Sequence, residues 1–192
     1  KLPAIQQPAE NKNSSTIADF KEALKHRHLA LGAVGIFVYV GAEVSIGSLL
    51  INYLGLDRVS AMEEVQAAAY ITYYWGGAMV GRFIGAAVMQ KVDAGKTLAF
   101  NAFMACLLIA ISLTTSGFVS MWAILLVGLC NSIMFPTIFS LALKNLKEYT
   151  SHGSGVLCLA IVGGALLPVL QGVMADTLGL TASFVLPVLC FV

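Results

Sequence analysis

Six long apolar runs occupy most of this sequence and decide what it can fold into. A membrane-spanning helix needs roughly 20 consecutive, mostly apolar residues, and the runs lie at about 29–54, 67–90, 97–115, 118–143, 154–175 and 180–192. The residues are 58% hydrophobic and 11% charged, whereas soluble domains have roughly 45–50% and about 25%. We therefore expect an all-α, polytopic membrane protein with six transmembrane helices. This composition excludes a soluble enzyme, and the net charge of +1 provides no basic field for nucleic acid.

The positions of the positive charges predict which ends of the helices face the cytoplasm. Nine of the eleven Lys and Arg residues fall in the N-terminal segment and the even-numbered loops, whereas Arg58 falls in an odd-numbered loop and Arg82 in a span. Cytoplasmic loops of membrane proteins carry the excess of cations. We therefore expect the N-terminal segment and the even-numbered loops to be cytoplasmic.

The first 28 residues differ from the rest because they are polar. They begin Pro/Asn/Gln/Ser-rich, and an amphipathic pattern with an N-cap at Thr16 follows. We interpret residues 1–28 as a cytoplasmic linker with a surface helix, of the kind that joins two halves of a longer chain, and residues 29–192 as a transmembrane bundle. The last run has 13 residues and no polar flank, so we expect its helix to continue beyond Val192.

Glu43 is the most informative polar residue. It lies about 14 residues into the first run, which is roughly 20 Å deep at 1.5 Å per residue. An acid at that depth usually faces a cavity or a partner on a transport path, and it suits a group that takes up and releases an ion. The alternative is a permanently protonated carboxyl that joins two helices. Tyr39, one turn away on the same face, can bond a ligand or Glu43 itself.

Asn131 is the corresponding polar residue in the fourth run. Its amide both donates and accepts, which suits sugar hydroxyls, and Phe135 lies one turn further on. Pro136 frees a backbone carbonyl and can kink this helix. The alternative is an amide that only joins neighbouring helices.

Two weaker candidates for ligand contact are Tyr74 and Gln171. Tyr74 belongs to an aromatic group with Tyr70, Tyr73 and Trp75, and an aromatic ring can stack on a sugar. The alternative is the aromatic belt that membrane proteins carry at their interfaces. Gln171 lies in the fifth run.

The second run carries a stripe of small residues, Gly77, Gly81 and Gly85, which predicts close helix packing of the kind a rocking bundle needs. Arg82 lies beside this stripe. We considered two roles for it: snorkelling to the surface, or a gating latch with Asp93 in the next loop.

The sequence predicts neither a metal site nor a cofactor. Its four cysteines stand singly, without a C-x-x-C pair, and its three histidines flank the apolar runs (Cys106, Cys130, Cys158, Cys190, His26, His28, His152).

Glu43 and Asn131 stand in the first and fourth of six spans, which fits a three-plus-three inverted repeat. Residues 39–48 (YVGAEVSIGS) and 131–140 (NSIMFPTIFS) also resemble the fucose–proton symporter family of the major facilitator superfamily. This resemblance implies that the chain corresponds to helices seven to twelve of a twelve-helix transporter in a bacterial inner membrane. The spans of Glu43 and Asn131 would then line the central cavity. An N-terminal six-helix half would be the partner.

The resemblance also implies uptake of a hexose such as glucose, galactose or fucose, coupled to H+ or Na+, by alternating access. From their positions in the runs, we expect Glu43, Asn131, Tyr39, Phe135, Tyr74 and Gln171 to bind the substrate and Glu43 to bind the coupling ion. The resemblance instead implies that the main proton-binding carboxylates lie in the N-terminal half, which would make Glu43 an auxiliary or sugar-binding acid. Two alternatives remain open at this stage. One is a self-contained six-helix channel or homodimeric carrier, and the other is a membrane sugar sensor that does not transport.

Overall fold

The computed structural model describes residues 22–146 and 149–192, and within these ranges its regular structure is helical with no strand. Residues 1–21 of the predicted linker, including Thr16, lie outside the described part. The helices are α2 (Arg27–Leu54), α3 (Glu64–Val88), α4 (Ala94–Thr114), α5 (Gly117–Asn131), α6 (Met134–Leu143), α7 (Thr150–Ala160), α8 (Gly163–Leu178), α9 (Leu180–Ser183) and α10 (Val185–Phe191).

The six apolar runs map onto these helices in two ways. The first three runs each form one uninterrupted helix, α2, α3 and α4. Each of the last three forms two helices in succession: α5 and α6, α7 and α8, and α9 and α10. Among the described residues, four of these spans are long and apolar enough to cross a membrane. They are Arg27–Leu54, Ala94–Thr114, Gly117–Leu143 and Thr150–Leu178.

A proline accompanies each interrupted span. Proline has no N–H and its ring clashes with the carbonyl four residues earlier, so a helix tends to break just before it. Pro136 and Pro187 are each the third residue of the second helix, α6 and α10. Pro168 lies inside α8, shortly after the break at residues 161–162.

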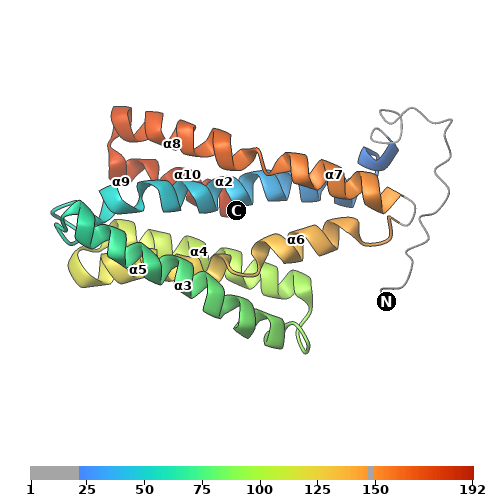
Figure 1. Cartoon of the computed structure of the whole chain (residues 1–192), viewed down its shortest axis with the longest axis horizontal. Coiled ribbons are helices and arrows are strands. Elements are labelled where there is room, and N and C mark those ends of the chain that lie inside the picture. Colours follow the sequence, from blue (N-terminus) through green and yellow to red (C-terminus); the bar gives the residue numbers. More distant parts are fainter. Residues whose placement is uncertain (1–21, 147–148) are drawn as a thin grey trace, which may run out of the picture.

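Helix α2 forms the centre of the bundle. It packs against α8, α6, α10, α7 and α3, whereas α5 packs mainly against α3 and α4. In Figure 1, α2, α8 and α10 lie in the upper part of the molecule and α3, α4 and α5 in the lower part. Large side chains such as Ile36, Ile46 and Leu50 are fully buried along α2.

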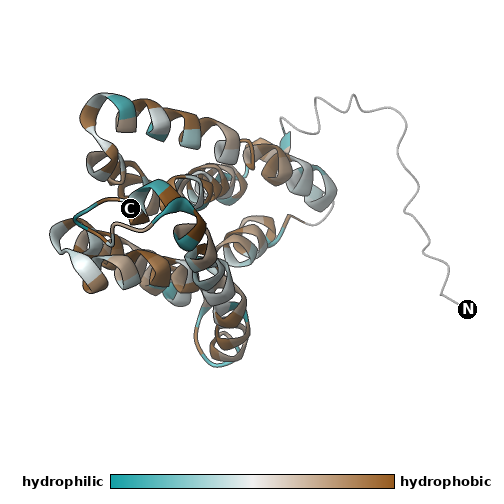
Figure 2. Cartoon of the chain, turned by 60° about the vertical axis from the view of Figure 1, so that its left-hand side comes forward, coloured by the Kyte–Doolittle hydropathy of each residue, from teal (hydrophilic) through white to brown (hydrophobic). Residues whose placement is uncertain are grey.

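The outer surface of the bundle is apolar, as lipid contact requires. Phe83, Phe103 and Phe118 are 75%, 65% and 74% exposed, and Figure 2 shows that hydrophobic residues occur along most of the helices. A water-soluble protein rarely exposes so continuous an apolar surface. The predicted class, an all-helical polytopic membrane protein, is therefore confirmed.

The connections that carry cations meet at one end of the bundle. The start of α2, the α3–α4 turn with Lys91 and Lys96, and the α6–α7 connection after Lys144 lie toward the right of Figure 1. Arg58 lies in the α2–α3 connection at the opposite end. This separation accords with the charge pattern, while the side of the membrane that each end faces stays a prediction.

Arg58 joins three segments at that opposite end, which the sequence did not indicate. Its Nη2 donates to the carbonyls of Ser112 (2.9 Å), Leu113 (3.1 Å) and Thr115 (2.5 Å), and its own carbonyl accepts from the Gly117 N–H (2.9 Å). A cation at the C-terminal end of α4 also complements the helix dipole. Beneath it, the Tyr53 hydroxyl and the Ser112 hydroxyl lie 2.9 Å apart.

We expect Arg58→Ala to lower the stability of the purified protein in detergent by about 3 kcal/mol. Hydrogen bonds from a charged donor are worth about 1.5–3 kcal/mol each, and partial exposure of Arg58 reduces their sum. Thermal unfolding would measure the change. Lys91→Ala, at an exposed position at the opposite end, is the control and should leave the melting temperature unchanged. Equal melting temperatures for the two variants would contradict a structural role for Arg58.

Candidate functional site

The break between α5 and α6 leaves main-chain carbonyls without helical partners. In a continuous helix the Ser132 carbonyl would accept from the N–H of residue 136, but that residue is proline. Instead, Arg82 Nε on α3 donates to the Ser132 carbonyl at 3.3 Å. The Tyr39 hydroxyl on α2 donates to the preceding carbonyl, that of Asn131, at 2.7 Å. Two side chains from two other helices therefore hold the break.

The side chain of Asn131 continues this polar network. Its Nδ2 donates to the Tyr74 hydroxyl at 3.0 Å, and that hydroxyl donates to the Glu43 carbonyl at 3.4 Å. Tyr74, Asn131 and Tyr39 are 0%, 1% and 3% exposed. The Asn131 Oδ1 atom is buried and has no hydrogen-bond partner. A buried amide oxygen without a partner is costly, so this atom is available to a donor from a ligand or a water.

The Glu43 carboxyl lies beside the same network. It is half-buried on α2 and close enough to the Tyr39 hydroxyl and the Arg82 guanidinium to interact with both. The structure therefore brings together four residues that the sequence singled out on three separate runs: Tyr39 and Glu43, Tyr74, and Asn131. We call these four the polar cluster.

The other predicted ligand residues lie away from the polar cluster or at its margin. Gln171 is fully buried, and its amide has no partner. It faces α2 one turn beyond Leu167, which packs against Gly41. Ser45, four residues after Gly41 on α2, also has a buried hydroxyl without a partner. Phe135 begins α6, half-buried, 5.9 Å from the ring of Phe139.

Two of the other aromatic residues of α3 are largely exposed. Tyr73 and Trp75 are 55% and 47% exposed, in contrast to the buried Tyr74. The ring of Tyr73 packs edge-on against Trp122 of α5 at 5.5 Å. The four aromatic residues therefore differ: Tyr74 belongs to the polar cluster, Tyr70 is half-buried against the core, and Tyr73 and Trp75 are largely exposed.

Three of the glycines of α3, Gly77, Gly81 and Gly85, face α5 and the break. A Cβ atom on Gly77 would lie 3.4 Å from the Leu129 main-chain nitrogen. One on Gly81 would lie 2.6 Å from the Leu129 carbonyl oxygen, and one on Gly85 would clash with Ile133. This close approach is what allows Arg82, on the same helix, to reach the Ser132 carbonyl.

Arg82 does not pair with Asp93 in this structure. The Asp93 carboxylate instead caps α4, where it accepts from the N–H groups of Gly95 (2.9 Å) and Lys96 (3.2 Å). An aspartate at an N-cap satisfies helix N–H groups that have no other partner. In this structure each residue thus binds main-chain groups instead of the other, and the latch remains one of the two roles considered for Arg82.

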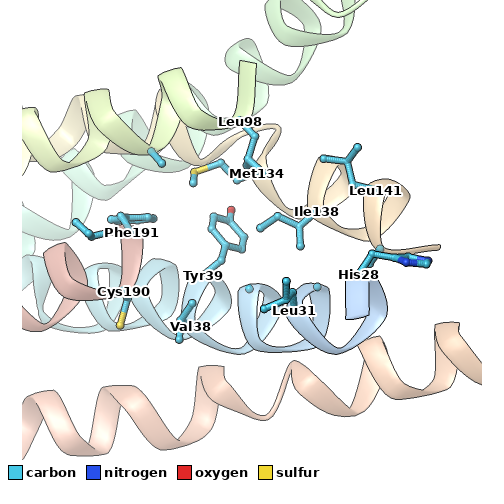
Figure 3. Close-up of a pocket in the computed structure, with 15 residues that line it drawn as sticks. His28, Leu31, Val38, Tyr39, Leu98, Met134, Ile138, Leu141, Cys190 and Phe191 are labelled. Carbon is cyan, nitrogen blue, oxygen red and sulfur yellow. The ribbon is translucent and has the colours of Figure 1, made fainter. Parts of the chain in front are cut away.

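A separate hollow of about 450 Å³ lies between α2, α4, α6 and α10. Figure 3 shows that apolar side chains such as Leu98, Met134 and Ile138 form its walls, with Tyr39 between them. The Tyr39 hydroxyl is already bonded to Asn131, and His28 lies at the far end. This hollow offers too few hydrogen-bonding groups for a sugar, so the polar cluster is the better candidate site.

Comparison with known proteins agrees with this architecture. The sequence profile of the Major Facilitator Superfamily matches residues 2–160, most of the chain. The chain belongs to the Major Facilitator Superfamily. The family resemblance expected from residues 39–48 and 131–140 is confirmed.

Several relatives are named transporters. The glucose/galactose transporter of Brucella abortus biovar 1 (strain 9-941) is 53% identical over 189 residues, 97% of this chain and 46% of that protein. The L-fucose-proton symporter of Escherichia coli (strain K12) is 32% identical over 194 residues, 100% of this chain and 44% of that protein. The crystal structure of FucP in the outward conformation matches with a TM-score of 0.90 at 32% identity, over 100% of this chain and 47% of that one.

The chain spans about half the length of the curated relatives it matches. These relatives are transporters and not enzymes, in agreement with the prediction from composition.

We expect Gly81→Ala to separate α3 from the α5–α6 break, because the added methyl group would meet the Leu129 carbonyl and the Ser132 side chain. Overpacking of this kind costs typically 1–3 kcal/mol. The matched control is Gly76→Ala on the same helix, where a Cβ atom meets nothing within 4 Å. In detergent, the melting temperature should fall for Gly81→Ala and stay unchanged for Gly76→Ala. A stable Gly81→Ala protein would contradict the packing role.

Proposed function

We propose that this chain forms one six-helix half of a sugar transporter that carries a hexose such as glucose, galactose or fucose together with a cation. The relatives are named for glucose, galactose and fucose transport, which supports the substrate class. The observation that carries the proposal is the polar cluster, where a buried amide oxygen without a partner lies beside an acid and two tyrosines.

The cluster has the chemistry that a hexose needs. Each sugar hydroxyl can donate one hydrogen bond and accept others. The Asn131 Oδ1 atom has no donor, and the Glu43 carboxyl accepts when it is ionised. We propose that Asn131 and Glu43 bind adjacent sugar hydroxyls, with Tyr39 and Tyr74 holding them in place. Phe135, at the start of α6, and Gln171 are proposed as further contacts.

Tyr39 offers a physical link between Glu43 and the helix break. Its hydroxyl has a single proton, which it donates to the Asn131 carbonyl. A protonated Glu43 can donate to the Tyr39 oxygen and leave that bond in place. An ionised Glu43 competes with the Asn131 carbonyl for the Tyr39 proton. We propose that ion binding at Glu43 changes the break in this way, and the name of the L-fucose-proton symporter favours H+ over Na+ as the ion.

The proposed partner is an N-terminal six-helix half of the same transporter. Secondary transporters place their sites at the interface between such repeats and expose them alternately to each side of the membrane. We propose a bacterial inner membrane location, with the cation-bearing end of the bundle in the cytoplasm.

Asn131→Ala in the full-length transporter should weaken sugar binding about tenfold or more. Loss of one or two hydrogen bonds of about 1 kcal/mol each, with a partner left unpaired, corresponds to that factor. Isothermal titration with glucose, galactose and fucose would measure it. The control is Asn101→Ala, since the Asn101 amide only donates to the Thr97 carbonyl of its own helix (2.9 Å). Unchanged affinity in Asn131→Ala would remove the amide from the site.

Glu43→Gln should reduce gradient-driven sugar uptake into proteoliposomes about tenfold or more, because the amide cannot take up a proton. Exchange of labelled sugar without a gradient should fall less. Glu63→Gln, at an exposed acid before α3, is the control. Wild-type uptake in Glu43→Gln would exclude Glu43 from the mechanism.

The same assays separate the other functions open from the sequence. Sugar flux through liposomes that contain residues 1–192 alone would favour a self-contained channel or a homodimeric carrier. Binding without exchange in the full-length protein would favour a sugar sensor.

A further inference from the structure

Two adjacent carbonyls at the α5–α6 break are each held by a side chain from a different helix. Tyr39 of α2 holds that of Asn131, and Arg82 of α3 holds that of Ser132. The peptide unit between Asn131 and Ser132 is planar, and each residue has only two soft dihedral angles. Fixing both carbonyls therefore fixes the two peptide planes on either side of residue 132, and the first of these planes includes the Asn131 Cα atom, from which the amide side chain leaves.

The need for Arg82 arises from Pro136. If residue 136 had an N–H, that group would be the normal partner of the Ser132 carbonyl. Because proline lacks it, the carbonyl of the buried Ser132 has no N–H donor from its own helix. Gly81 allows α3 to approach closely enough for the neighbouring guanidinium to take that place.

The geometry points to Arg82 as a positioning residue of the substrate site, which acts on Asn131 through the Ser132 carbonyl. This inference rests on the proposed function for the site itself, but the link from Arg82 to Ser132 and Pro136 is independent of what the site binds. Arg82 does not need to touch the sugar. It holds the break in the form in which the Asn131 amide faces Tyr74 and Oδ1 remains free.

A different role would be electrostatic, since the Arg82 charge also interacts with Glu43. The two roles make opposite predictions for one substitution. Pro136→Ala returns an N–H to residue 136, which can bond the Ser132 carbonyl and make Arg82 dispensable for positioning. If Arg82 instead acts through its charge on Glu43, Pro136→Ala does not replace that charge, and Arg82 remains as important as in the parent protein.

The experiment compares the full-length transporter with its Arg82→Ala, Pro136→Ala and double variants. Sugar affinity is measured by isothermal titration, and thermal unfolding is measured in detergent. We expect Arg82→Ala to weaken binding about tenfold in the parent protein and about threefold or less in the Pro136→Ala background. A Pro168→Ala background is the matched control, since Pro168 lies inside α8 of another span, and it should give no rescue. Arg82→Lys, which keeps a donor, should retain more affinity than Arg82→Ala.

An equal loss of affinity from Arg82→Ala in all three backgrounds would overturn the inference and favour the electrostatic role. If Arg82→Ala does not fold, folding itself becomes the measurement. Folding of Arg82→Ala with Pro136→Ala, but not of Arg82→Ala with Pro168→Ala, would support the positioning role. Failure of both double variants to fold would overturn it. If the parent protein binds none of the three sugars, the proposed function fails. The unfolding temperatures then still test the link to Ser132. A smaller loss of unfolding temperature from Arg82→Ala in the Pro136→Ala background than in the parent would support it, and an equal loss would contradict it.

Discussion

The need to satisfy every main-chain carbonyl inside an apolar bundle governs this structure. Where a helix is continuous the requirement is met within the helix, but proline removes the donor at three places in the last three spans. At the α5–α6 break, side chains of Tyr39 and Arg82 supply the missing donors. The side chains that bond these free carbonyls, Tyr39 and Arg82, therefore also lie around the candidate site.

Close packing by small residues makes this solution possible. Three glycines of α3 let this helix lie directly against the end of α5, and Gly41 and Gly163 do the same for α2 and α8. Association of helices in lipid depends on such contacts because lipid tails compete with apolar side chains. In this bundle the contacts also set the register between helices, which decides which polar side chains meet.

Much of the fold could be predicted from the sequence, because the apolar runs give both the class and the approximate position of each span. The positions of Glu43 and Asn131 as buried polar residues also followed from their depth in those runs. Their connection through Tyr39 and Tyr74 could not be predicted, since it depends on the register of helices far apart in the sequence. The roles of Arg58 and Arg82 were hardest to predict, because both bind main-chain carbonyls, and the residue types in a sequence do not indicate a main-chain partner. Pro136, four residues after Ser132, was the available signal for Arg82.

The distribution of the breaks gives the two triplets of spans different mechanical properties. Helices α2, α3 and α4 run for 28, 25 and 21 residues without interruption, so bending any of them would sacrifice main-chain hydrogen bonds. The spans from α5 onward have already given up bonds at their interruptions, and reorienting a segment there costs less. We therefore expect reorientation within the bundle to cost less in the interrupted spans than in the continuous ones, and Asn131 lies at the end of α5, directly at one of the interruptions.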